Sequence, residues 1–315
     1  MSQPARLSAP LVTQMRKVRP RVLDGGIGGE LARREAAAGP AATLAANLDA
    51  PNAVRKAHRA MIRAGCDVVR TNTSGLTPAI VRSLGGGRGG IDRMAIKLAT
   101  LAAQHANHAV KREGAGRRAL VAGVLPPLDT EEALGDAAFL RAYRLLADTL
   151  APVTDVLLAD RITSSRAAVS AVNASAATGA PIWIWWHCVV TPGQGGAAAL
   201  PSGEPLEHAA AKVAASSPLA WIDAQVACGA ASATSVAVLP TLEACARELP
   251  TTSLLGCAAT AAAYDGEAAT SPEALATLVR PLLERGCSIV GGGDDATTTA
   301  HVAASKGVVA GFLER

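Results

Sequence analysis

The sequence has few aromatic residues and lacks the patterns that mark several protein classes. Aromatic residues make up 3% of its 315 residues, although half of the chain is apolar, so much of the apolar content is alanine. No run of about 18 purely apolar residues is present, which argues against a membrane-spanning helix. The chain has no basic block and a formal net charge of only +4, so neither a membrane nor nucleic acid is an expected partner.

Paired cysteines are also missing. The six cysteines occur singly, with no CxxC motif, and the amino terminus has no secretory apolar segment. This pattern predicts reduced thiols in a cytoplasmic protein. The sequence is compatible with a homo-oligomer but does not specify an oligomeric state.

What the chain does have is a regular alternation of short apolar runs and helical patterns. The apolar runs lie at 21–23, 67–70, 119–124, 156–159, 181–186, 224–227, 253–255 and 287–290. The helical patterns lie at 52–64, 91–112, 137–150, 164–178, 206–214, 240–249, 272–285 and 298–313. Eight strands that alternate with eight helices predict an α/β fold, a (β/α)8 TIM barrel in a single domain over residues 19–315. Residues 1–18 are expected to form a poorly ordered lead.

In such a barrel the active site forms at the carboxyl ends of the strands. The polar and thiol residues directly after the apolar runs are Asp24, Thr71, Asn72, Thr73, Asp160, Arg161, His187, Cys188, Cys228, Cys257, Asp294 and Asp295. Asp294 and Asp295 follow three glycines, which permit a close approach to a ligand, so they are the first candidates for chemistry. The set predicts a site for a small polar ligand, with or without a metal.

Residues 183–187 (WIWWH) form the densest aromatic stretch. On a strand, Trp183 and Trp185 face one way while Ile184 and Trp186 face the other. Core packing on both faces is the favoured interpretation. A wall on which a ligand stacks, with His187 at the mouth, is the alternative.

Several segments resemble the homocysteine S-methyltransferase family in order and spacing. Residues 24–31 (DGGIGGEL) resemble its DGGxGTEL opening, and residues 64–73 (AGCDVVRTNT) resemble its AGADxxxTNT segment. Residues 202–206 (SGEPL) match its SGEPL turn. The YDG at 264–266 and the SPE at 271–273 stand where its YD and SPE elements stand. The agreement extends from about residue 20 to residue 313.

The resemblance implies a barrel enzyme that moves a methyl group from a sulfonium or ammonium donor to a small thiol such as homocysteine. In the family, three cysteines hold a zinc ion that keeps the acceptor thiol as a thiolate. Cys228 matches the first of these ligands. The other two, in a GGCC element, are replaced by Asp294 and Asp295. We therefore expect a degenerate zinc site formed by Cys228, Asp294 and Asp295, with zinc bound weakly or not at all and another divalent ion as an alternative.

The resemblance also implies the substrate-binding set: Asp24, Gly25, Glu30, Thr71, Asn72, Thr73, Asp160 and Arg161. Here Asp160 stands where the family has the glutamate that recognises the substrate's amino group, and Arg161 follows it. Gly29 stands where the family opening has threonine. Ser74 and Gly75 stand where an aromatic residue would be expected, so a quaternary ammonium donor such as betaine is disfavoured.

Three functions follow from these residues. The first is a divergent S-methyltransferase that uses a sulfonium-type donor, with Cys228, Asp294 and Asp295 as the catalytic residues. The second is another enzyme in which Asp294 and Asp295 act as general bases or divalent-metal ligands. The third is a non-catalytic barrel that has lost the zinc site.

Overall fold

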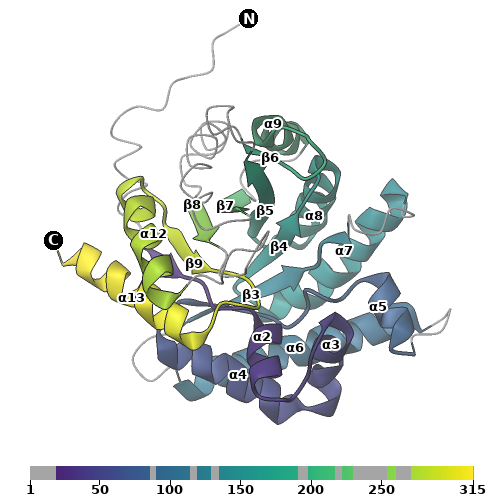
Figure 1. The fold of residues 1–315 in the computed structure, drawn as a ribbon. Coiled ribbons are helices and arrows are strands. Elements are labelled where there is room, and N and C mark those ends of the chain that lie inside the picture. Colours follow the sequence, from purple (N-terminus) through teal and green to yellow (C-terminus); the bar gives the residue numbers. More distant parts are fainter. Residues whose placement is uncertain are drawn as a thin grey trace, which may run out of the picture.

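The structure is a computed structural model that describes residues 19–85, 90–113, 119–128, 135–190, 198–216, 222–229, 254–259 and 271–314 (Figure 1). For residues 190, 222–229 and 254–259 it describes the backbone alone. The predicted lead at 1–18 and the predicted helix at 240–249 lie outside these ranges.

Eight parallel strands form a closed barrel, as predicted. The strands are β1 (Arg21–Val22), β2 (Val68–Arg70), β3 (Leu120–Leu125), β4 (Val156–Ile162), β5 (Ile182–Val190), β7 (Ile222–Gly229), β8 (Leu254–Ala259) and β9 (Ile289–Gly292). Their order in the sheet is β1-β9-β8-β7-β5-β4-β3-β2, with every neighbouring pair parallel. A parallel bridge between Leu23 and Val68 joins β1 to β2 and closes the ring. A two-residue strand, β6 (Ala198–Ala199), pairs antiparallel with β5.

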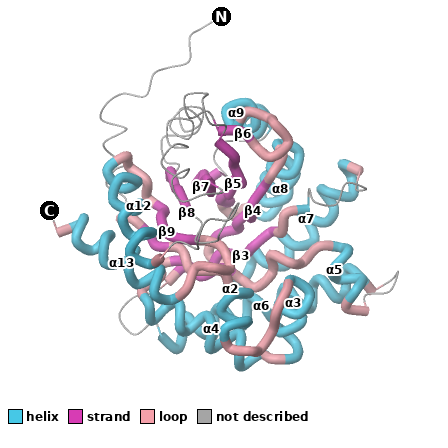
Figure 2. The backbone as a smooth tube through the Cα atoms, viewed as in Figure 1, coloured by secondary structure: helices cyan, strands magenta, loops and turns pink. Residues whose placement is uncertain are grey.

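Helices surround the strands on the outside (Figures 1 and 2). They are α2 (Ile27–Arg33), α3 (Pro40–Asp49), α4 (Pro51–Ala64), α5 (Pro78–Ser83), α6 (Ile91–Glu113), α7 (Asp136–Leu150), the 3-10 turn η2 (Ala151–Val153), α8 (Ser165–Thr178), α9 (Leu206–Ser216), α12 (Pro272–Glu284) and α13 (Thr299–Leu313). Sequence analysis did not predict α2, α3 or α5. Helix α2 begins after Gly26 without a side-chain cap, and α2 and α5 are 7 and 6 residues long, so each gives little helical periodicity.

The aromatic stretch of β5 packs on both sides of the sheet. Trp183 and Trp185 lie in the barrel interior with Leu23, Leu158 and Ile289. Ile184, Trp186 and Cys188 belong to the larger cluster between the sheet and the helices. All three tryptophans are at most 1% exposed, so the core-packing interpretation is confirmed.

The barrel seam between β1 and β2 is reinforced by a side chain at the amino ends of the strands. Asp67 Oδ2 accepts a hydrogen bond from the Val22 backbone N at 2.9 Å. The same oxygen forms an ion pair at 2.9 Å with Lys306 of α13. One carboxylate therefore ties both seam strands to the last helix.

Among the helices in the described ranges, none combines the length and the apolar character that a bilayer-spanning helix requires.

Candidate functional site

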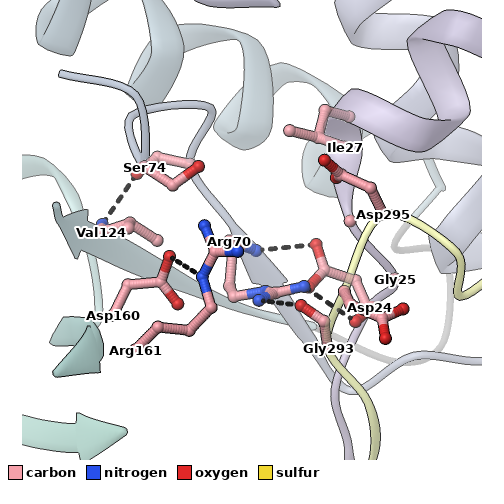
Figure 3. A pocket seen from close by; sticks show the side chains of 13 residues that line it. Asp24, Gly25, Ile27, Arg70, Ser74, Val124, Asp160, Arg161, Gly293 and Asp295 are labelled. Carbon is pink, nitrogen blue, oxygen red and sulfur yellow. Dashed lines mark hydrogen bonds and ion pairs between the residues drawn. The ribbon is translucent and has the colours of Figure 1, made fainter. Parts of the chain in front are cut away.

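A pocket lies at the carboxyl ends of the strands (Figure 3). It is formed by the ends of β2, β3 and β4 and by the loops after β1, β2 and β9. The residues that line the pocket are Asp24, Gly25, Gly26, Ile27, Arg70, Thr71, Ser74, Val124, Asp160, Arg161, Gly293, Asp294 and Asp295. The structure thus brings seven of the predicted site residues together: Asp24, Gly25, Thr71, Asp160, Arg161 and the Asp294–Asp295 pair that follows β9.

The floor of the pocket is a buried ion pair between Asp24 and Arg70. Arg70 Nε donates to Asp24 Oδ1 at 2.7 Å, and the Arg70 backbone N donates to Asp24 Oδ2 at 2.9 Å. Arg70 Nη2 donates to the Asp24 carbonyl at 3.2 Å, and Nη1 donates to the Gly293 carbonyl at 2.9 Å. The guanidinium also lies 4.9 Å from the centre of the Trp185 ring, a cation-π contact. The two side chains are 1% and 10% exposed, so water screens this pair little.

The charges of this pair depend on each other. Burial raises the pKa of the Asp24 carboxyl, and the Arg70 guanidinium opposes that shift. Burial lowers the pKa of Arg70, but the carboxylates of Asp24 and Asp160 outweigh it and raise that pKa above its ordinary value. Arg70 therefore remains a cation.

A bulge in β4 places Asp160 and Arg161 at the mouth. The register between β4 and β5 shifts between Ala159 and Ile162, and Arg161 has a left-handed backbone with φ of 46°. Asp160 is 2% exposed, while the Arg161 side chain is 46% exposed. Arg161 Nε lies 3.4 Å from Asp160 Oδ2, and Asp160 raises the pKa of Arg161. Asp160 Oδ1 is buried and has no hydrogen-bond partner within the described part of the chain.

Asp294 and Asp295 lie at the turn between β9 and α13. Asp294 Oδ1 accepts hydrogen bonds from the backbone N and the hydroxyl of Thr297, both at 2.9 Å. The carboxylate of Asp295 lies against Gly26 and Gly28: a Cβ on Gly26 would stand 2.2 Å from Asp295 Oδ1. Both carboxylates therefore have contacts within the protein that shape this turn.

The same turn explains the glycine at position 29. A Cβ on Gly29 would stand 1.7 Å from the Asp295 carbonyl oxygen, so a threonine there would collide with the backbone. The path of the backbone at residue 295 therefore requires glycine at position 29.

Three predicted substrate-binding residues lie outside the pocket lining. Glu30 forms ion pairs with Arg33 and Arg34 at 3.2 and 2.6 Å. Asn72 Nδ2 donates to the Thr43 carbonyl at 2.7 Å, and Thr73 Oγ1 donates to the Val124 carbonyl at 2.7 Å. These contacts hold the loops in place, and direct substrate binding by Glu30, Asn72 and Thr73 stays a prediction.

Cys228 lies near the carboxyl end of β7. Its backbone pairs in register with His187 of β5 and Ala258 of β8, but its side chain lies outside the described part of the structure. Its role as a ligand or a catalytic residue stays a prediction. Two other thiols were considered after strands: Cys188 is buried between the sheet and the helices, and the side chain of Cys257 lies outside that part.

Arg70 is the main functional residue that sequence analysis missed. A usable signal existed, because side chains alternate along a strand. Val68 points into the barrel interior, so Arg70, two residues later, points the same way. A single cation on the inward face at the end of a barrel strand indicates a site residue.

Comparisons with known proteins agree with this fold. The metallated form of the homocysteine methyltransferase MmuM from Escherichia coli aligns with a TM-score of 0.74 and 20% identity, covering 95% of this chain and 99% of MmuM. A type I 3-dehydroquinate dehydratase from Clostridium difficile aligns with a TM-score of 0.53 and 6% identity, covering 95% of this chain and 94% of the dehydratase. These similarities concern the fold alone.

A comparison with curated protein sequences finds no significant match. The family model for homocysteine S-methyltransferase, in contrast, matches residues 21–309, nearly the whole barrel. That range contains all the strands of the described residues and all of the pocket residues named above. The chain therefore belongs to the homocysteine S-methyltransferase family, a family of methyltransferases.

Proposed function

We propose that this protein moves a methyl group from a sulfonium-type donor to a small, homocysteine-like thiol. In this reaction the thiolate attacks the methyl carbon, a new carbon-sulfur bond forms, and the donor's carbon-sulfur bond breaks. The electron pair of the broken bond stays on the donor sulfur, which becomes a neutral thioether, and the thiol proton passes to solvent. The protein's main task in such a transfer is to hold the two sulfur centres in line.

The observation that carries this proposal is Asp160 Oδ1, a buried oxygen with no hydrogen-bond partner among the described residues. A buried carboxylate oxygen without a donor is unfavourable, and the ammonium group of an amino-acid substrate would supply one. The wider pocket also favours cationic groups, because four carboxylates (Asp24, Asp160, Asp294, Asp295) face two guanidiniums (Arg70, Arg161). A sulfonium donor carries such a positive charge.

Zinc, the cofactor implied by the family resemblance, does not fit the residues that the structure describes. In the described ranges no three His, Cys, Asp or Glu side chains form a group that could hold a metal. Asp294 is bonded to Thr297, and Asp295 lies against Gly26 and Gly28. The same contacts disfavour the second function, in which these two aspartates act as bases or metal ligands.

The test is a methyl-transfer assay with homocysteine and a sulfonium amino acid that carries a deuterated methyl group. Mass spectrometry of the thiol product should show the label. Asp160→Asn should lower kcat/KM by roughly 10- to 100-fold, because a hydrogen bond from a charged group to the carboxylate is lost.

Asp148→Asn, an exposed change on α7, is the matched control and should leave kcat/KM unchanged. Equal activity of the Asp160→Asn variant and the unmodified protein would contradict the assigned role of Asp160. Absence of labelled product with every sulfonium donor would instead favour the non-catalytic barrel. We further propose a cytoplasmic location, because the six cysteines are spread singly along the sequence with no CxxC motif.

A further inference from the structure

The geometry points to Arg70 as the replacement for the metal: its guanidinium supplies the fixed positive charge at the mouth of the barrel, and the site is complete without zinc. This inference concerns the site of the proposed function and rests on that function only for the identity of the ligand. Its electrostatic part stands on the contacts of Arg70 itself.

Arg70 reaches the segment where the two absent zinc ligands would lie. Its Nη1 donates to the carbonyl of Gly293, the residue directly before Asp294. Its charge interacts with Asp24 and Asp295, in the loops after β1 and β9, and with Asp160, in the bulge of β4. One buried cation thus interacts with carboxylates from three segments, as a bound metal ion would.

The guanidinium is held in this position from several sides. Three of its N–H groups donate to Asp24 Oδ1, the Asp24 carbonyl and the Gly293 carbonyl. The Trp185 ring lies against it, and that ring approaches Gly293 so closely that a Cβ there would stand 1.6 Å from Trp185 Cη2. These contacts oppose a movement that would clear the mouth for a metal ion.

Arg70 and Arg161 would also weaken the attraction between a divalent ion and the carboxylate of Asp295. Arg70 and Arg161 both interact electrostatically with Asp295, so a metal ligated there would stand in the field of two guanidiniums. Arg70 therefore accounts for the loss of the two thiolates at positions 294 and 295. The positive charge that a metal ion would supply comes from the Arg70 guanidinium.

Zinc binding tests this inference without measuring methyl transfer. Each protein is titrated with zinc alone in a calorimeter, and its zinc content after dialysis is measured by elemental analysis. The unmodified protein should retain well under one equivalent of zinc, and a chelator should not change its melting temperature. Asp294→Cys with Asp295→Cys should raise the zinc affinity, since soft thiolate ligands return.

The decisive comparison adds a change at position 70 to the double-cysteine protein. Arg70→Gln, which removes the charge, should raise the zinc affinity at least tenfold further. Arg70→Lys, which keeps the charge, should leave it unchanged. Circular dichroism shows whether each variant folds.

If Arg70→Gln and Arg70→Lys gave the Asp294→Cys, Asp295→Cys protein the same zinc affinity, the inference would be overturned. One tightly bound equivalent of zinc in the unmodified protein would also overturn it. That measurement does not depend on whether Arg70→Gln folds. Because no substrate is present, either result is independent of whether the protein transfers methyl groups.

Discussion

His58 on α4 is a histidine that the structure seals from water. It is 0% exposed, and neither ring nitrogen has a hydrogen-bond partner within the described residues. Burial, with a smaller effect of nearby His105, lowers the pKa of His58 from 6.5 to about 3. The folded protein therefore keeps His58 neutral under conditions in which the unfolded chain protonates it.

Because the pKa of His58 is lower in the folded protein than in the unfolded chain, the unfolding free energy falls as the pH falls. The stability linked to His58 is fully present above pH 6.5 and is lost as the pH falls toward about 3. Its slope approaches about 1.4 kcal/mol per pH unit within that window. We predict that His58→Met flattens the fall of the unfolding free energy between pH 7 and pH 5, measured by urea denaturation at each pH.

His208→Gln on α9 is the control, because His208 is exposed. This variant should lose stability with falling pH as the unmodified protein does. An unchanged slope in His58→Met would show that His58 is protonated in the folded state.

At the scale of single elements, the turn between β9 and α13 depends on the missing side chain at Gly293. The Trp185 ring of β5 occupies the space that a Cβ would take, and the Arg70 guanidinium lies 4.9 Å from the centre of the same ring. Glycine is therefore needed here for close approach, and the turn and the barrel interior are packed as one unit.

We predict that Gly293→Ala lowers the unfolding free energy by about 3 kcal/mol, because the added methyl group must displace a large buried ring. Gly311→Ala is the matched control: Gly311 lies in α13, and a Cβ there would meet nothing within 4 Å. This change should raise stability by about 0.5 to 1 kcal/mol. Chemical denaturation of both variants checks the pair, and equal effects of the two changes would contradict the packing described for Gly293.

The sequence predicted the elements of the fold well and the direction of side chains less well. All eight parallel strands lie at predicted apolar runs, because burial on both faces makes such strands continuously apolar. The helices α2, α3 and α5 were not predicted. Helices α2 and α5 are too short to show the hydrophobic period of a helix. Asn72 and Thr73 were placed at the mouth, but their partners, Thr43 and Val124, are 29 and 51 residues away in the sequence. Contacts over such distances have no local pattern.

At the scale of the whole molecule, the closure of the barrel depends on carboxylates at both ends of one seam. Between β1 and β2 the structure has the bridge of Leu23 with Val68. Asp67 supports the amino end through Val22 and Lys306, and the Asp24–Arg70 pair supports the carboxyl end. The backbone itself crosses the seam with two hydrogen bonds, from the Asp67 N to the Val22 carbonyl at 2.7 Å and from the Asp24 N to the Val68 carbonyl at 3.0 Å, and these side chains reinforce that short contact.

We predict that Asp67→Ala lowers the unfolding free energy by about 2 kcal/mol, since hydrogen bonds from a backbone N–H and a charged amine are lost together. Hydrogen exchange should show faster opening of β1 and β2 than of β4 and β5. Asp148→Ala, which removes an exposed carboxylate from α7, should change neither quantity. Uniform acceleration of exchange over all strands would contradict a weak seam.

The double use of the Asp24–Arg70 pair has a consequence for directed evolution of this enzyme. Arg70 both supports the seam of the barrel and contributes to the charge of the pocket. Most substitutions at position 70 would therefore impair folding before a change in activity could be detected. Positions 160 and 161 lie on the bulge of β4. Arg161 is exposed and has a left-handed backbone conformation, which glycine also adopts without strain. Libraries aimed at new methyl acceptors should therefore vary positions 160 and 161 while they keep Asp24 and Arg70 unchanged.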